Sequence, residues 1–167
     1  MIETKRLILK PVTLLDYDLY ENILSCPDMT KYLPKGSPYT EQEVFSHVVK
    51  RVEHWNLGFG SYIVYLKSDL NKKLCYVGIE TSPNPKCSEI RYAFTADGQG
   101  KGYALEAAKA VLKKTFQLDF HTDIYGVAVK ANMPSVKILE KLGMVENSSA
   151  IIYDEEDLIT LSVAKFV

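Results

Sequence analysis

Residues 92–116 have the sequence YAFTADGQGKGYALEAAKAVLKKTF, which predicts a strand, a glycine-rich turn and a helix in succession. Aromatic residues open the strand, and from Ala104 onward apolar side chains recur at helical spacing, at Leu105, Ala108, Val111, Leu112 and Phe116. In the turn, Gly98, Gly100 and Gly102 permit positive φ values and close approach of a ligand to the backbone. Because the first N–H groups of a helix are unpaired and carry positive partial charge, the turn predicts a phosphate or pyrophosphate site.

The spacing of the glycines separates this turn from the common nucleotide motifs. Gly98, Gly100 and Gly102 fall at alternate positions, which fits neither G-x-x-x-x-G-K-[ST] nor G-x-G-x-x-G. The pattern Q-x-x-G-x-A does fit, at Gln99, Gly102 and Ala104. Here the sequence resembles the GCN5-related N-acetyltransferase (GNAT) superfamily, whose acyl-coenzyme A pyrophosphate loop is written Q/R-x-x-G-x-G/A. From this segment alone, a turn that binds nothing is the alternative.

The composition bears on the class of partner and on the compartment. With 167 residues, 47% hydrophobic and 25% charged, the chain suits one globular domain over residues 1–167. A net charge of −1 gives no basic field for nucleic acid or anionic membrane. Cys26, Cys75 and Cys87 are widely spaced, so we expect reduced thiols and no metal site. The N-terminus is too charged for a signal peptide, and no apolar run approaches the ~18 residues of a membrane span. We therefore expect a cytoplasmic protein.

The rest of the chain predicts strands interleaved with helices. The expected strands cover residues 5–10, 61–67, 74–81, 89–95, 123–129, 145–153 and 158–166. The expected helices cover residues 14–24, 40–55, 104–116 and 132–142. Loops or turns are expected at residues 29–39, 69–71 and 154–157. Strands interleaved with helices, followed by a terminal hairpin, indicate a mixed α/β layer fold.

Two further motifs extend the resemblance over nearly the whole chain. The opening TKRLIL, residues 4–9, looks like the T-x-R-L-x-L start of the RimJ/RimL branch, which acetylates N-terminal amines of ribosomal proteins; many relatives with other acceptors share it. NMPS at 132–135 and LEKLGM at 139–144 are similar to that branch's N-x-x-S…L-E-K-x-G-F. The resemblance implies an α/β (α+β) GNAT-type fold. Its mixed, mostly antiparallel sheet would have about seven strands, helices on both faces, and a splayed strand pair that binds acetyl-coenzyme A.

The resemblance also implies which residues hold acetyl-coenzyme A, the acetyl-donating cosubstrate. The strand ending near Phe94 would splay from the strand around Val127 and pair its backbone with the pantetheine arm. Residues 99–104 would wrap the pyrophosphate, and Lys101 would add side-chain charge there. The alternative for Lys101 is a solvated side chain with only its backbone N–H engaged. Asn132 would contact the pantetheine and can also cap its helix. The implied cofactor-binding set is Phe94, Gln99, Gly100, Lys101, Gly102, Tyr103, Ala104, Asn132 and Ser135, with no metal.

Attack of an amine on a thioester needs a proton acceptor, and the departing thiolate needs a proton or oriented donors. Many superfamily members place an acidic tyrosine on the second cofactor helix, where this chain has Leu139. The RimL-like branch implies Ser135 as the acid, with a helix cap as the alternative. Glu89 resembles the strand glutamate of histone-acetylating members and is the candidate base or water-orienting group. Glu80 could replace it or face solvent. The hairpin glutamate of RimL-like enzymes has no counterpart in residues 150–153.

These motifs predict an acetyl-coenzyme A-dependent N-acetyltransferase that acts on a primary amine, for which a protein N-terminal α-amine is one candidate. Acetylation of a small amine (a polyamine, an amino acid or an aminoglycoside) is the alternative among enzymes. A small acceptor would need an enclosed, carboxylate-lined cavity, whereas a protein terminus would need an open groove. A coenzyme A-binding module without turnover is the alternative from another class, because the helix tyrosine and the hairpin glutamate are missing. Edge pairing of the terminal hairpin is one route to a homodimer.

Overall fold

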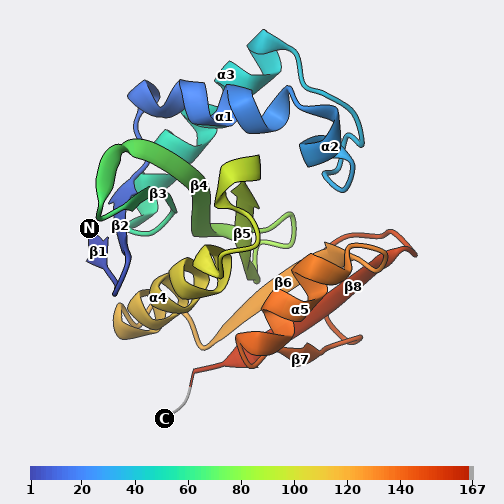
Figure 1. The fold of residues 1–167 in the computed structure, drawn as a ribbon. Coiled ribbons are helices and arrows are strands. Elements are labelled where there is room, and N and C mark those ends of the chain that lie inside the picture. The colour runs from blue at the N-terminus through green and yellow to red at the C-terminus, as the bar shows by residue number, and fades with distance from the viewer. Residues whose placement is uncertain (166–167) are drawn as a thin grey trace.

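One eight-stranded sheet lies between two groups of helices in the computed structural model, which describes residues 1–165 (Figure 1). The strands are β1 (Ile2–Glu3), β2 (Leu7–Pro11), β3 (Ser61–Leu66), β4 (Asp69–Thr81), β5 (Ser88–Phe94), β6 (Asp123–Val129), β7 (Val145–Glu146) and β8 (Leu158–Ala164). The α-helices are α1 (Tyr17–Leu24), α2 (Pro27–Thr30), α3 (Glu41–His54), α4 (Tyr103–Gln117) and α5 (Met133–Lys141). Short 3-10 turns cover Leu14–Asp16, Trp55–Leu57 and Ala96–Gly98.

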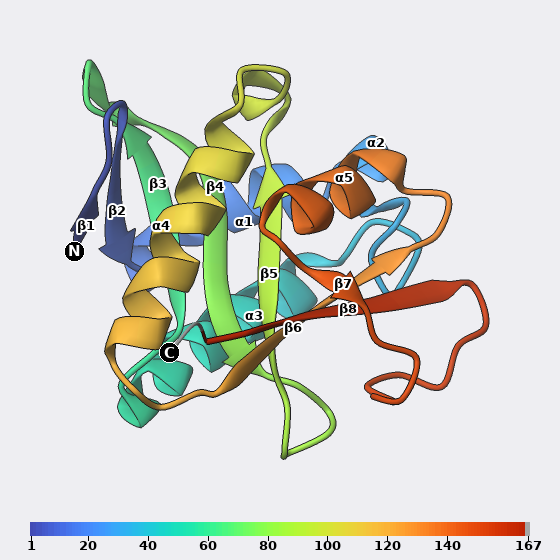
Figure 2. The same cartoon turned by 90° about the horizontal axis from the view of Figure 1, so that it is seen from below.

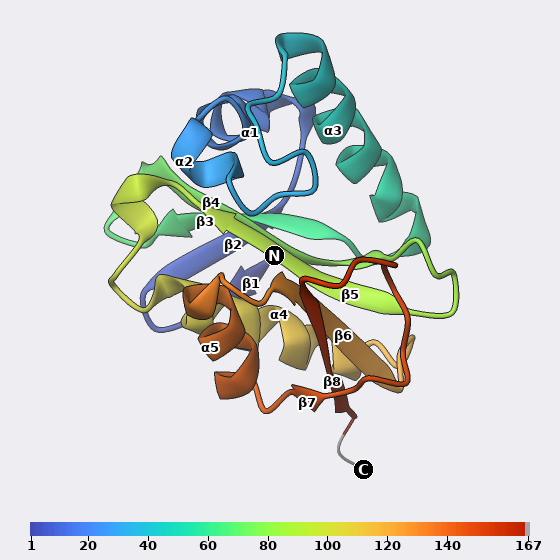
Figure 3. The ribbon, with the colours of Figure 1, turned by 90° about the vertical axis from the view of Figure 1, so that its right-hand side faces the viewer.

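Helices cover both faces of the sheet. Figure 3 shows α1, α2 and α3 on one face and α4 and α5 on the other. Each face has its own apolar core: Tyr20, Ile23, Val44 and Val48 pack on the first, and Ala107, Val111 and Leu139 on the second. The predicted mixed α/β fold is confirmed, with eight strands rather than about seven because the two-residue β1 was not expected. Burial on both faces explains the unbroken apolar run in β4, where Leu74 to Ile79 are all buried.

The sheet contains a single parallel pairing. Its order is β1-β2-β3-β4-β5-β6-β8-β7, and every neighbouring pair is antiparallel except β5 and β6. These two strands pair only where Glu89 meets Tyr125. Beyond that point they separate, as Figure 2 shows, while β5 stays paired with β4 and β6 with β8. Residues 90–94 and 126–129 therefore face each other across a V-shaped opening, which we call the V.

The turn that leads into α4 has the predicted glycine conformations at two of its three glycines. Gly100 and Gly102 have φ values of 74° and 75°, in the left-handed region that glycine adopts without strain. The third, Gly98, has no positive φ, and its role is close packing. A Cβ at Gly98 would lie 2.9 Å from the carbonyl oxygen of Leu74. Helix α4 then begins at Tyr103 with Gly102 as its N-cap.

Three expected segments differ from the structure. Residues 69–71 belong to β4 rather than to a turn, because β3 and β4 shift register at Tyr65 and the chain reverses at residues 67–68. The loop expected at 29–39 begins inside α2, for which Pro27 is a suitable first residue. The expected strand 145–153 is reduced to β7, because the chain leaves the sheet edge after Asn147 bonds to β8. Residue 166, the expected end of the last strand, lies outside the described residues.

A buried ion pair ties α3 to the sheet. Arg51 Nε lies 3.3 Å from Glu80 Oε1, without the alignment of a hydrogen bond, and the Ser61 hydroxyl donates to the same oxygen at 2.5 Å. Arg91 Nη1 donates to the other oxygen at 3.3 Å. Glu80 is 5% exposed, so the expectation that it could face solvent is wrong. Burial alone would raise the pKa of Glu80, but the guanidinium groups of Arg51 and Arg91 hold the pKa below its usual value.

This depressed pKa predicts a pH-dependent stability. The contribution of Glu80 is present above its unfolded pKa of about 4.3 and is lost as pH falls through the lower folded pKa. We expect Glu80→Gln to lower the free energy of unfolding by about 3 kcal/mol at pH 7, because Arg51 stays buried without its partner. The difference in free energy of unfolding between the wild type and Glu80→Gln, measured by urea denaturation, should become smaller below about pH 4. Glu140→Gln, on the exposed face of α5, is the matched control and should change neither value. A difference in free energy of unfolding that stays constant from about pH 3 to 7 would contradict the depressed pKa of Glu80.

Candidate active site

Several of the predicted site residues come together around the V. Phe94 ends β5, and the amide of Gln99 donates to its carbonyl oxygen at 3.4 Å. On the far side of the V, Ser135 in the first turn of α5 contacts Tyr92 of β5. The glycine turn, the end of β5 and the start of α5 thus lie within one region. Glu89 lies at the point where β5 and β6 begin to separate.

The turn presents unpaired donors. Within residues 1–165, the backbone N–H groups of residues 100–105 have no acceptor, and the first bond of α4 joins the N–H of Glu106 to the Gly102 carbonyl. Donors at a helix start, with the positive end of its dipole behind them, favour an anion. Lys101 Nζ donates to the carbonyl oxygen of Asp97 at 3.1 Å, so its side chain folds back on the turn. Phe94 can contact a ligand only through its backbone, because its side chain is buried in the core.

A tyrosine that the sequence analysis missed accompanies Ser135. The Tyr92 hydroxyl lies 2.9 Å from Ser135 Oγ and 3.1 Å from the Ser135 carbonyl oxygen. Burial raises the pKa of the Tyr92 phenol to about 12, so the phenol stays protonated at neutral pH. Asn132 Oδ1 accepts from the Ser135 N–H at 3.4 Å, which confirms Asn132 as the helix cap. Ser135 Oγ therefore has a phenol partner, and the cap is formed by another residue.

Leu139 lies at the position for which the sequence resemblance implied a tyrosine acting as the acid. Its side chain is 1% exposed, and it packs so closely on β6 that a Cβ at Gly126 would lie 2.5 Å from Leu139 Cδ2. A polar group there would be buried without a partner in this packing. The hydroxyls of Ser135 and Tyr92 lie together on this face of the sheet, beside the V.

A charged cluster occupies the opposite face, beneath α3. Glu89 is 3% exposed, and its Oε1 accepts from Arg91 Nε at 2.9 Å and Nη2 at 2.5 Å. The Tyr153 hydroxyl donates to the same oxygen at 2.5 Å. Arg91 also pairs with Glu80, which in turn meets Arg51. Two carboxylates and two guanidiniums therefore form a neutral group in which Glu89 Oε2 has no partner among the described residues.

From the sequence alone, no role was assigned to Tyr153 or to Arg91. Tyr153 reaches Glu89 from residues 147–157, far along the chain, so local pattern could not connect them. Burial raises the pKa of the Tyr153 phenol, and its hydrogen bond to Glu89 adds to the shift. The available signal was the alternation of β5: Glu89 and Arg91 share one face of the strand, whereas Tyr92 lies on the other.

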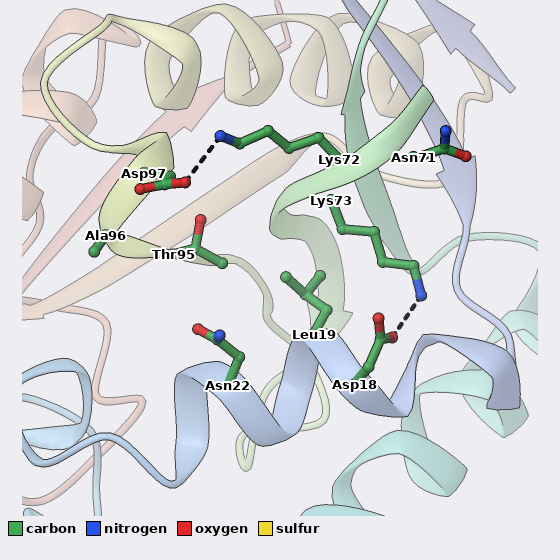
Figure 4. Close-up of a pocket in the computed structure, with 9 residues that line it drawn as sticks. All are labelled: Asp18, Leu19, Asn22, Asn71, Lys72, Lys73, Thr95, Ala96 and Asp97. Atoms are coloured by element: carbon green, nitrogen blue, oxygen red, sulfur yellow. Dashed lines mark hydrogen bonds and ion pairs between the residues drawn. The ribbon is translucent and has the colours of Figure 1, made fainter. Parts of the chain in front are cut away.

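Two surface depressions lie outside this region. One, of about 430 Å³, lies between α1, the start of β4 and the segment after β5. Figure 4 shows that Lys72 reaches Asp97 and Lys73 reaches Asp18, so its charges are paired. The other, of about 440 Å³, is lined by Tyr17, Glu41, Gln42 and Phe45. Neither includes the glycine turn or Ser135. The described residues contain no group of three potential metal ligands, and none of their helices has the length and apolarity to cross a membrane.

Known proteins resemble this chain in sequence and in fold. Residues 6–145 match the model of the acetyltransferase (GNAT) domain family. The chain is 29% identical over 157 residues to the uncharacterized N-acetyltransferase YnaD of Bacillus subtilis (strain 168), covering 86% of this chain and 81% of that protein. An acetyltransferase from Agrobacterium tumefaciens str. C58 has a TM-score of 0.86 at 20% identity, covering 97% of this chain and 92% of that chain.

Two further solved structures were determined with coenzyme A. RimL, a ribosomal L7/L12 α-N-protein acetyltransferase, has a TM-score of 0.78 at 13% identity, covering 96% of this chain and 95% of that one. Spermidine N-acetyltransferase from Vibrio cholerae has a TM-score of 0.78 at 17% identity, covering 97% of each chain. At these identities the structures establish the fold, and the family model covers most of the chain. The protein belongs to the GNAT family of acetyltransferases and is an acyltransferase.

Proposed function

We propose that this protein transfers the acetyl group of acetyl-coenzyme A to a primary amine, with the α-amine of a protein N-terminus as the acceptor. The observation that carries the proposal is the separation of β5 and β6 at Glu89 and Tyr125, next to a helix whose first N–H groups are unpaired. An extended arm could pair with the open edge of β5 while its anionic end binds at the turn. Acetyl-coenzyme A has both parts.

The residues around the V fit such a cosubstrate. The N–H groups of residues 100–105 would hold the pyrophosphate, with Gln99 at the entrance and Lys101 contributing through its backbone. The backbone of residues 90–94 would pair with the pantetheine arm, and the amide nitrogen of Asn132 is available to it because only its oxygen serves as the cap. When bound, acetyl-coenzyme A supplies the acetyl group as a thioester.

Ser135 and Tyr92 would stabilise the negative charge that develops on the departing sulfur. Tyr92 can donate to Ser135 Oγ, which frees the Ser135 hydroxyl hydrogen to point into the V. A phenol with a pKa of about 12 does not give up its proton to a thiolate, whose conjugate acid is near 8.5. The pair would therefore act as aligned hydrogen-bond donors, and the proton that neutralises the thiolate would come from the attacking amine.

The charged cluster on the other face would receive the amine. The acceptor amine must lose a proton before it can attack. Glu89 is the carboxylate at the apex of the V, where the amine would arrive. Because Arg91 and Tyr153 both use Oε1, we infer that Oε2 orients a water molecule that accepts this proton. Glu89 would thus act through water, with Arg91 and Tyr153 as its positioning residues.

The charge balance of this cluster favours an acceptor with a single amine. A polyamine carries several positive charges and needs unpaired carboxylates to bind. Glu80 and Glu89 are instead neutralised by Arg51 and Arg91. A peptide N-terminus brings one amine and can leave the rest of its chain in an open groove. The opening motif TKRLIL and the similarity in fold to RimL are compatible with this acceptor.

A small polycationic amine is the second candidate, because four acidic residues follow Tyr153. Asp154, Glu155, Glu156 and Asp157 are exposed, and they lie next along the chain to the residue that contacts Glu89. They could attract a cation such as spermidine, the substrate named for the Vibrio cholerae structure. This candidate differs from the first in the acceptor and leaves the cosubstrate unchanged.

Gly102→Val tests the cosubstrate site. Valine at a φ of 75° is strained, and the shifted turn would no longer present its N–H groups, so we expect coenzyme A affinity to fall at least about tenfold in calorimetry. Gly36→Val is the matched control, because Gly36 also has a positive φ, of 64°, and a Cβ placed there would meet nothing within 4 Å. Gly36 lies in the segment between α2 and α3, outside the V. Equal affinity in the two variants would overturn the pyrophosphate assignment.

Ser135→Ala and Tyr92→Phe test the donor pair. Each should lower kcat for acetyl transfer by about ten- to a hundredfold while the coenzyme A dissociation constant changes less than about threefold, because the donors act on charge that develops in the reaction. The double variant should be little worse than Ser135→Ala, since Tyr92 acts through Ser135. Unchanged kcat in Ser135→Ala would leave the serine a structural residue.

The acceptor is tested by thiol release at saturating acetyl-coenzyme A. We expect release with peptides that have a free N-terminus and none with the same peptides blocked at the N-terminus, even when they contain lysine. Spermidine and an aminoglycoside complete the panel. Release with spermidine alone would favour the small-amine candidate. Coenzyme A binding without release from any acceptor would instead indicate a binding module.

A further inference from the structure

Arg6 packs against the glycine turn and Thr4 contacts helix α4 behind it, and the function proposed above gives neither residue a role. Arg6 Nη1 donates to the carbonyl oxygen of Lys101 at 3.0 Å. Its guanidinium carbon lies over the ring of Tyr103, 4.6 Å from the centroid. A Cβ placed on Gly102 would be 3.6 Å from Arg6 Nη2. The guanidinium group of Arg6 therefore lies directly beside the turn.

Glu106 explains why a cation is needed at this position. Its carboxylate is in the first turn of α4, where an unpaired negative charge would repel a phosphate. Oε1 accepts from the Thr4 hydroxyl at 2.6 Å and from the Arg6 backbone N–H at 2.9 Å. Oε2 pairs with Arg6 Nε at 2.7 Å. Both oxygens are occupied, and the charge of Glu106 is balanced by Arg6.

Arg6 still has donor capacity after these contacts. Nε serves Glu106 and Nη1 serves Lys101, whereas Nη2 has no acceptor within residues 1–165. The side chain is 43% exposed, so a ligand can reach it. A guanidinium fixed at two nitrogens loses little freedom when the third binds an anion, which a lysine ammonium could not reproduce.

We propose that Arg6, held in place by Thr4 and Glu106, is a phosphate-binding residue of the glycine turn. Nε and Nη1 keep the turn in shape, and Nη2 contacts a phosphate oxygen of the nucleotide-linked thioester. This inference rests on the proposed function, because acetyl-coenzyme A is the phosphate-bearing ligand. It gives the opening motif TKRL a chemical role. The threonine hydroxyl holds the helix carboxylate by a hydrogen bond, and the arginine neutralises its charge. Nη2 of the arginine then supplies a side-chain donor beside the turn, which Lys101 does not, because its side chain folds back onto Asp97.

A purely structural role is the competing explanation. The same contacts join the start of the chain to α4, and their loss could simply loosen the fold. The two roles differ in their dependence on phosphate. A phosphate-binding residue affects only donors that carry phosphate, whereas a structural residue affects every acetyl donor alike.

The experiment compares Arg6→Met, Arg6→Lys and the charge control Lys109→Met, which removes one exposed positive charge from the same helix. Calorimetry gives the dissociation constant for coenzyme A at 50 and 200 mM NaCl. We expect Arg6→Met to weaken binding about tenfold at low salt and Arg6→Lys about threefold, and the wild type to lose more affinity with salt than Arg6→Met does. Lys109→Met should bind like the wild type.

A second donor separates the two roles. S-acetylpantetheine carries the same thioester and no phosphate, so kcat/KM with this donor should be the same in Arg6→Met as in the wild type, within about twofold. An equal loss with both donors would establish the structural role and overturn the proposal, as would unchanged coenzyme A affinity in Arg6→Met. If the wild type binds no coenzyme A, the proposed function fails at once, before any variant is compared, and the Arg6 proposal fails with it.

Discussion

The meeting of β5 and β6 at a single position is the constraint on which the rest of the structure depends. Two parallel strands joined through α4 would ordinarily continue as neighbours, but here the pairing stops after Glu89 and Tyr125. Backbone groups beyond that point are left without a strand partner, which is costly unless water or a ligand engages them. The glycine turn and the start of α5 lie at this opening, so one irregularity of the sheet creates the region in which both reactants could meet.

The alternation of β5 divides the chemistry between the two faces of the sheet. Glu89 and Arg91 point toward α3 and join a buried, charge-balanced cluster. Tyr92 points the other way and meets Ser135 on α5. Successive residues of one strand can therefore serve the incoming amine and the departing sulfur, with the V between them. Burying four charges is expensive, and pairing each carboxylate with a guanidinium offsets that cost.

Local sequence features predicted much of this arrangement because they act over a few residues. Helix α3 starts where the expected helix 40–55 does, because a capping box at Thr40 and Glu43 joins neighbouring residues there. Asn132 likewise caps α5. The expected strand after Val145 failed for the opposite reason. Residues 150–152 are apolar, but residues 146–149 are polar. Tyr153 bonds to Glu89, and the chain leaves the sheet edge and crosses toward β5.

The sequence by itself determined the family, the order of strands and helices, and the glycine turn, because periodicity, caps and glycine positions depend on local geometry and short motifs. Only the tertiary structure decided which distant side chains meet. Arg6 reaches Glu106 across 100 residues, and Tyr92 reaches Ser135 across 43. No local sequence pattern predicts either contact, because each depends on how the sheet brings separate segments together. Local sequence patterns therefore determine the helices, strands and turns, whereas tertiary packing determines which side chains come together at the site.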